Sequence, residues 1–221
     1  MNKTIPFIIL GLIMLALTIM SATATTLLNI TGTTDAYWNS GVSNGDVAFR
    51  IAQGFQLSNS SNITGTDIYF GSKVGTGCNG YYWVELQTDN TGLPSNTTIG
   101  ITQKISRDSI PNTSNQNFNF TSTTQIFANT TYWLVVNHNE TATGCVEYIG
   151  YCGGGCYADG TMAYSYPDWT WVAYGDDLGV ILYGELTNAT SNETNETNET
   201  FPAFNETTDI ILSTDFTGGN V

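Results

Sequence analysis

Aromatic and acidic side chains gather in one stretch of this sequence, from residue 148 to residue 171, and the combination is suited to binding sugars. Aromatic faces pack against the apolar faces of sugar rings, and carboxylates accept hydrogen bonds from sugar hydroxyl groups. A disulfide between Cys152 and Cys156 would hold the stretch rigid and so lower the entropic cost of binding. The alternative, which the sequence leaves open, is that these rings cap one end of a β-sandwich. The candidate ligand-binding residues are Tyr148, Tyr151, Tyr157, Asp159, Tyr166, Asp168 and Trp169, and the same stretch also contains Tyr164 and Trp171.

Carboxylates elsewhere in the chain are candidates for a calcium site. Asp176 and Asp177 are adjacent, so in a strand they would point to opposite faces and would make a poor general acid and base pair. Asp177 could instead join Asp35 or Asp46, because calcium prefers oxygen ligands supplied by loops. The alternative is that all of them are solvated turn carboxylates. No cofactor is expected beyond this structural calcium ion.

Four cysteines, an even number, predict two disulfides in an exported chain, with three connectivities open. We expect Cys152 to pair with Cys156 across a glycine turn, and Cys78 to pair with Cys145. A zinc site is the rival interpretation. It is disfavoured because the spacing is not that of two C-x₂-C knuckles and because the expected compartment is oxidising.

The sequence contains no motif of a known catalytic centre. It has no H-E-x-x-H, no G-x-S-x-G and no P-loop, and its single histidine, His138, follows a predicted strand and enters a polar loop. A glycosidase built from two carboxylates distant in sequence is the enzymatic alternative, since no motif would reveal it. Because the catalytic motifs are absent from the sequence, we expect a protein that is not an enzyme.

The charge balance narrows the classes of partner. The 221 residues include five Lys and Arg against 19 Asp and Glu, which gives a net charge of −14. Such a chain has no basic surface for nucleic acid or for anionic lipid headgroups. The expected partner is a glycan or a surface protein.

These candidate residues must be positioned by short strands, because no long segment has helical periodicity. The strongest strand signal is residues 129–136, where both alternating faces are apolar, so we expect a central strand covered on both sides. Tyr81 to Thr88 alternates with Tyr82, Val84 and Leu86 facing inward. Gly54, inside another predicted strand, indicates a bulge, and residues 145–160 are expected to form a loop. Strands separated by frequent turns predict an all-β fold, an antiparallel β-sandwich of jelly-roll type.

The two ends of the chain have distinct compositions. Residues 1–24 read as a signal peptide with an A-x-A cleavage site; an uncleaved membrane anchor is the alternative. The folded domain is expected over residues 25–187, followed by a flexible linker at 188–208, rich in Asn, Glu and Thr, and a lone strand or the start of a further domain at 209–221. That last strand could mediate self-association. Glycosylation is expected at the sequons of Asn188, Asn192, Asn195, Asn198 and Asn205.

The order of several features between residues 53 and 184 is similar to a known family. These features are Gln53-Gly-Phe55, the turn Thr91-Gly-Leu-Pro-Ser95, Phe118 and Phe120, the run Thr131-Tyr-Trp-Leu-Val-Val136, a glycine-rich loop, Trp171, and Asp177-Leu-Gly-Val-Ile-Leu-Tyr-Gly184. Together they resemble the jelly-roll domains of bacterial, archaeal and phage surface proteins, which are similar to galactose-binding-like, carbohydrate-binding modules. The resemblance implies a non-catalytic domain that binds glycan or displays other modules, and such domains often hold a calcium ion near the terminal strands.

The sequence thus predicts a secreted or cell-surface β-sandwich module that binds carbohydrate or mediates adhesion. The alternative is a structural component of a surface layer or appendage. The resemblance supplies no binding residue by itself, because the loop with Cys145, Cys152 and Cys156 is not part of the family pattern.

Overall fold

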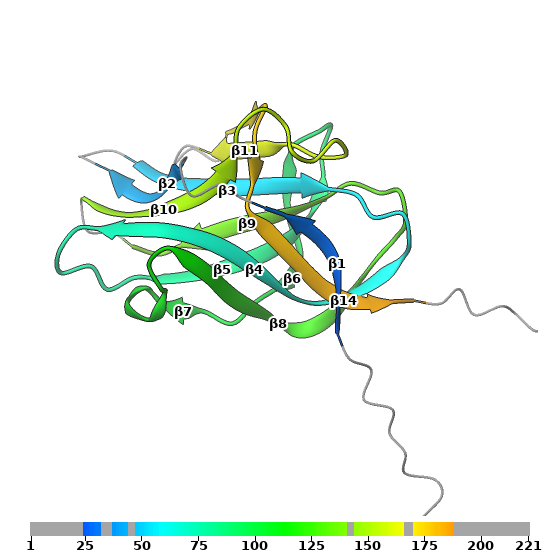
Figure 1. Cartoon of the computed structure of the whole chain (residues 1–221), viewed down its shortest axis with the longest axis horizontal. Coiled ribbons are helices and arrows are strands. Elements are labelled where there is room, and N and C mark those ends of the chain that lie inside the picture. Colours follow the sequence, from blue (N-terminus) through cyan, green and yellow to red (C-terminus); the bar gives the residue numbers. More distant parts are fainter. Residues whose placement is uncertain (1–23, 32–36, 44–46, 141–143, 166–169, 188–221) are drawn as a thin grey trace, which may run out of the picture. The chain divides into compact units, whose positions relative to one another are not determined.

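A computed structural model of the chain describes residues 24–31, 37–43, 47–140, 144–165 and 170–187, with side chains described outside residues 37–49 (Figure 1). Within these ranges the protein is all-β, and the one helical turn is the 3₁₀ segment Arg107–Ser109. Two antiparallel sheets pack as a sandwich, which confirms the predicted fold class. The predicted signal peptide, linker and C-terminal strand lie outside the described residues, as do Asp35, Asp46, Tyr166, Asp168, Trp169 and the sequons from Asn188 onward.

Each sheet draws its strands from distant parts of the chain. The first contains β1 (Thr25–Ile30), β2 (Tyr37–Ser43), β4 (Ser61–Val74), β8 (Ser114–Ile126), β10 (Cys145–Cys152) and β14 (Val180–Leu186). The second contains β5 (Tyr81–Asp89), β6 (Pro94–Ile101), β7 (Ile105–Ser106), β9 (Tyr132–His138), β11 (Met162–Ser165) and β12 (Trp171–Tyr174). β3 (Val47–Phe55) pairs in both sheets, and the short β13 (Asp177–Leu178) pairs with the end of β10.

β4 is the centre of the first sheet. One edge of β4 pairs with β8, and the other edge pairs first with β14 and then with β10. The change of partner occurs near Phe70, which lies opposite Ser114 of β8 and Ile149 of β10. β1 extends the sheet beyond β14, and β2 extends it beyond β10.

The two sheets are joined along both sides of the sandwich. On one side the first part of β3 pairs with β2, and its second part pairs with β9 and β11, so β3 passes from one sheet into the other. On the other side Thr102, just after β6, forms an antiparallel bridge with Phe120 of β8. The second sheet has the order β12-β11-β3-β9-β5-β6. This strand order does not confirm the jelly-roll part of the prediction.

The main core lies between the sheets. On β5, Tyr82, Val84 and Leu86 are fully buried, as the alternation predicts. β9 is buried on both faces: Leu134 and Val136 belong to the main core. On the opposite face of β9, Trp133 and Val135 belong to a second cluster on the outer face of the second sheet, completed by Ala52, Ala163 and Trp171. The prediction of a central strand covered on both sides is confirmed.

Gly54 does not form a bulge with β9, because its pairing with Trp133 is in regular register. The glycine serves packing instead. A Cβ at this position would lie 3.0 Å from Cη2 of Trp133, so the indole ring lies directly over the backbone of Gly54. The absence of a side chain is therefore required by a close approach.

The stretch predicted to be a loop, residues 145–160, begins with the regular strand β10. Glu147 on this strand points into the interior, and Ile149 on the same face joins the main core. The prediction was wrong because an inward glutamate and a dense set of Gly, Cys and Tyr masked the alternation. No helix in the described part of the chain has the length and apolar character needed to cross a bilayer.

Candidate functional site

Two disulfides hold the loops at the ends of β10. Cys78–Cys145 joins the segment before β5 to the first residue of β10, with Cα atoms 5.8 Å apart. Cys152–Cys156 closes the turn after β10, with Cα atoms 6.0 Å apart. This is the pairing expected from the sequence, and two such bonds are consistent with an oxidising compartment outside the cell.

The structure does not bring the predicted tyrosines of β10 together. Tyr151 packs against the main core from the same face of β10 as Ile149. Tyr148 is three residues away and therefore points to the opposite face, because successive strand residues alternate. The two rings cannot bind one sugar from the same surface.

Tyr157 fixes the disulfide loop to the end of β3. Its hydroxyl donates a hydrogen bond to the carbonyl oxygen of Gln56 at 2.6 Å and accepts one from the Gln56 N–H at 3.2 Å. Burial raises the pKa of Tyr157. Its ring also packs against the main core, so much of this side chain is committed to the fold, whereas Asp159 nearby is exposed.

The hairpin of β11 and β12 presents two different faces. On one face Trp171 is buried in the second cluster, with the guanidinium of Arg50 4.9 Å from the centre of its ring. The indole N–H of Trp171 donates a hydrogen bond of 3.1 Å to Oδ1 of Asn96. These contacts fix the side chain of Trp171 on the outer face of the second sheet.

The opposite face of this hairpin carries Tyr164, Val172 and Tyr174, here named the tyrosine surface. The rings of Tyr164 and Tyr174 meet edge to face with centroids 6.3 Å apart. Tyr174 is 42% exposed and Val172 is 36% exposed. The predicted residues Tyr166, Asp168 and Trp169 belong to the segment that joins β11 to β12.

Sequence reasoning missed Tyr174 and Val172 as surface candidates. The signal was present in the alternation of Trp171, Val172, Ala173 and Tyr174, which places Val172 and Tyr174 opposite the buried Trp171. The predicted site is centred on the cysteine loop and ends at Trp171, so it does not include these two residues.

A polar network covers part of the outer face of the second sheet. Glu85 accepts hydrogen bonds from Nε1 of Trp83 at 3.0 Å, Nε2 of Gln87 at 2.9 Å and Oγ1 of Thr98 at 2.8 Å. The ammonium of Lys104 lies 4.4 Å from the centre of the Trp83 ring. Because these groups bond to one another, the network supports a packing role for Trp83.

Asp177 is almost fully buried, and both of its carboxylate oxygens accept hydrogen bonds. Oδ1 accepts from Nε2 of Gln53 and Oδ2 accepts from the N–H of Tyr157, at 2.9 and 2.8 Å. The carboxylate thus joins β3 to the disulfide loop. Its predicted partners in calcium binding, Asp35 and Asp46, lie outside the described residues, and the calcium site stays a prediction.

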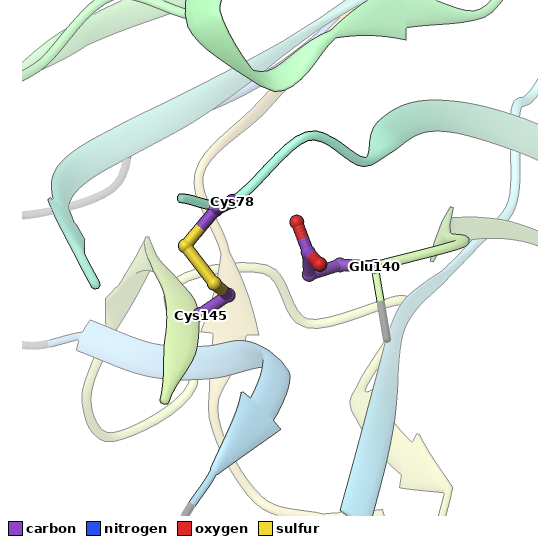
Figure 2. A group of neighbouring side chains, drawn as sticks. All are labelled: Cys78, Glu140 and Cys145. Carbon is purple, nitrogen blue, oxygen red and sulfur yellow. A yellow bond between two sulfur atoms is a disulfide. The ribbon is translucent and has the colours of Figure 1, made fainter. Parts of the chain in front are cut away.

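One cluster in the described residues has the composition of a metal site. The ligand atoms of Cys78, Cys145 and Glu140 lie within 4.8 Å of one another, and Figure 2 shows the glutamate beside the disulfide. The sulfurs are bonded to each other and so do not act as thiolate ligands. Oε2 of Glu140 accepts hydrogen bonds from the N–H groups of Asn79 and Gly80, both at 2.9 Å. The cluster therefore closes the loop before β5.

A buried charge network lies next to this loop. Glu147 forms an ion pair with Arg107, and the Tyr82 hydroxyl donates a hydrogen bond to the same carboxylate. Desolvation is the largest effect on Glu147 and raises its pKa, against the hydrogen bond from Tyr82 and the charge of Arg107. His138, the last residue of β9, stacks on Tyr82 with ring centroids 5.6 Å apart. Tyr82, Arg107 and Glu147 are all buried, so this charge network lies in the interior.

The fold and these features define a disulfide-bonded, all-β domain with two antiparallel sheets. Neither the models of known protein families nor the curated proteins give a match to this chain.

Proposed function

We propose that the protein is an exported, non-catalytic carbohydrate-binding module that mediates adhesion, and that sugar rings pack on the tyrosine surface. The observation that carries the proposal is the pair of adjacent tyrosine rings, Tyr164 and Tyr174, on a hairpin whose opposite face is anchored by Trp171. Tyrosine rings combine an apolar face for sugar C–H groups with a hydroxyl for sugar oxygens.

The anchoring of the hairpin supports this role, because a rigid surface loses little entropy on binding. β11 pairs with β3 over residues 162–165. The N–H of Met162 donates to the carbonyl oxygen of Asp176, and the N–H of Gly54 donates to that of Thr161, both at 2.8 Å. The base of the hairpin is thus bonded on both sides.

The distribution of sequons also supports this surface. No asparagine occurs between Asn139 and Asn188, although sequons are frequent on both sides of that interval. The strands from β10 to β14 therefore cannot carry N-linked sugar of their own, which leaves the hairpin available to a glycan partner.

The test is a glycan-array screen of the exported protein, wild type against a variant with both Tyr164→Ala and Tyr174→Ala. Loss of two ring contacts of about 1 kcal/mol each would weaken binding to the best glycan roughly 30-fold. Tyr81→Ala is the matched control, because Tyr81 is 45% exposed on β5 and lies outside the hairpin.

Repeating the screen with a calcium chelator tests the predicted ion. Binding that disappears with the chelator would support a calcium site at Asp177. Arrays that remain blank with and without calcium, or binding unchanged in the double variant, would overturn the proposal.

A second candidate function is assembly into a surface layer or appendage. Its supporting observation is that β1 and β12, within the described residues, each pair with a single strand, β14 and β11 respectively. Unpaired strand edges accept strands from other chains. The predicted strand in residues 209–221 would be the donor.

A further inference from the structure

A groove of about 300 Å³ opens on the outer face of the first sheet. It is lined by Asn29 and Ile30 at the end of β1, by Thr31 directly after it, and by Tyr69 of β4, Asn115 of β8 and Ile181 of β14. The groove is unrelated to the tyrosine surface, which belongs to the second sheet.

The groove exists because the strands change partners at this point. β14 leaves the edge of β4 after the pair Val180 and Ile68, and the backbone of Gly179 continues the contact by accepting the N–H of Tyr69 at 3.2 Å. The pairing of β1 ends beside this position, at Ile30 and Val180. The side chain of Tyr69 therefore lies next to the last residues of β1.

The last two residues of β1 and the residue that follows them form a glycosylation sequon, Asn29-Ile30-Thr31. Ile30 is buried, whereas Asn29 and Thr31 are exposed, as alternation along a strand requires. All three residues line the groove. The side-chain amide of Asn29, the acceptor of the sequon, thus lies in the lining of a groove that is also lined by the ring of Tyr69 and the amide of Asn115.

We propose that Asn29 carries an N-linked glycan and that this groove holds its first sugar ring. In the attachment step Nδ2 of Asn29 forms a bond to C1 of the sugar while the bond from C1 to the diphosphate of a lipid-linked donor breaks. The lipid diphosphate leaves with the bonding electrons, and the amide loses one proton to a base of the transferase. The donor and the transferase belong to the export machinery that this class of sequon requires.

The groove suits one sugar ring in size and chemistry. Its volume is at the lower end of the range of roughly 300–1,000 Å³ for small-molecule sites. Tyr69 and Ile181 offer apolar surface to one face of the ring, and the amide of Asn115 offers a donor and an acceptor to its hydroxyl groups. The sugar would connect β1 to β4 and β8 and so become part of the fold.

The first measurement is glycopeptide mass spectrometry of the protein exported by the cells that produce it. We expect the peptide containing Asn29 to carry sugar. Detection of this peptide only in its unmodified form would overturn the proposal.

The second measurement tests the groove by thermal unfolding of four exported proteins: wild type, Tyr69→Leu, Asn29→Gln and the double variant. If the sugar packs on the ring, Tyr69→Leu lowers the Tm by roughly 2–4 °C more with the glycan at Asn29 than in the Asn29→Gln background. Asn112→Gln is the matched control, because Asn112 is an exposed sequon residue outside the groove, and it should leave the effect of Tyr69→Leu unchanged.

A third readout does not depend on stability. In the glycosylated protein the ring of Tyr69 should shift the NMR signals of the first sugar's ring protons, and Tyr69→Leu should remove the shift. An equal loss of Tm in both backgrounds together with unshifted sugar signals would show that the glycan projects into solvent, and the groove would not be its site.

Discussion

Glu147 is fully buried on β10 and contacts both Arg107 and Tyr82, so a charged residue occupies a position that the strand pattern reserves for an apolar one. Burial of an unpaired carboxylate costs several kcal/mol, and a well-placed partner offsets that cost. Lys73 lies opposite Glu147 on β4 and donates hydrogen bonds to the carbonyl oxygens of Arg107 and Ile110. The network thus connects β4, β5, β10 and the 3₁₀ turn.

Stability should depend on pH through Glu147. Its pKa in the folded protein is raised above the 4.5 of an ordinary glutamate, chiefly by desolvation. Between those two pKa values the folded state holds a proton that the unfolded chain has lost, so stability from this group is complete at low pH and falls as pH rises. Urea unfolding of wild type and Glu147→Gln from pH 4 to pH 8 should show the wild type losing stability relative to the variant. A wild type that gains stability relative to Glu147→Gln as the pH rises would contradict this assignment.

The two disulfides should contribute unequally to the free energy of unfolding. Cys78 and Cys145 are separated by 67 residues and Cys152 and Cys156 by 4. In the chain-entropy model a disulfide restricts the unfolded state more when its loop is longer. The model gives a stabilisation of about 4 kcal/mol for Cys78–Cys145 and about 2 kcal/mol for Cys152–Cys156.

The measurement is denaturant unfolding of two double variants, Cys78→Ser with Cys145→Ser and Cys152→Ser with Cys156→Ser. The first should lower the free energy of unfolding more than the second. An equal loss in both would show that local packing, rather than loop length, sets the contribution of each disulfide.

The sequence predicted those strands whose side chains follow a simple rule. β5 alternates and β9 is apolar on both faces, and both lie where expected. β10 was missed because its inward glutamate is acceptable only beside Arg107, which comes from a distant part of the chain. The role of Gly54 was misjudged for a similar reason, since the ring that lies over it belongs to Trp133.

The candidate site was predicted in part. The disulfide pairing and the general location of the aromatic residues follow from the sequence. The sequence does not predict on which face of the sandwich each of these side chains lies. That depends on the order of the strands, which determines where β4 changes its partner and where Trp171 is anchored. Tyr148 and Tyr151 are close in sequence, but they lie on opposite faces of β10.

The two sheets are joined by β3 on one side of the sandwich and by the bridge between Thr102 and Phe120 on the other. The remaining strand edges available for pairing in the described residues include those of β1 and β12. Self-association through a donated strand should therefore require residues 209–221, and removing residues 206–221 should convert an oligomer to a monomer in size-exclusion chromatography.

The control for this experiment is a chain of full length with Ile210→Asp and Leu212→Asp, which keeps the length but opposes strand pairing through charge. It should also run as a monomer. A monomer in the wild type, or an oligomer after truncation, would count against assembly through this segment.

The pairing of β1 with β14 has a mechanical consequence. Thr25 lies opposite Gly184, two residues before β14 ends at Leu186, so the polypeptide enters and leaves the domain at the same end. Tension applied between these two points would break the β1–β14 hydrogen bonds one after another, because those bonds lie across the strands. The domain would yield at low force by peeling β1, while the disulfide-linked segment from Cys78 to Cys145 would resist extension.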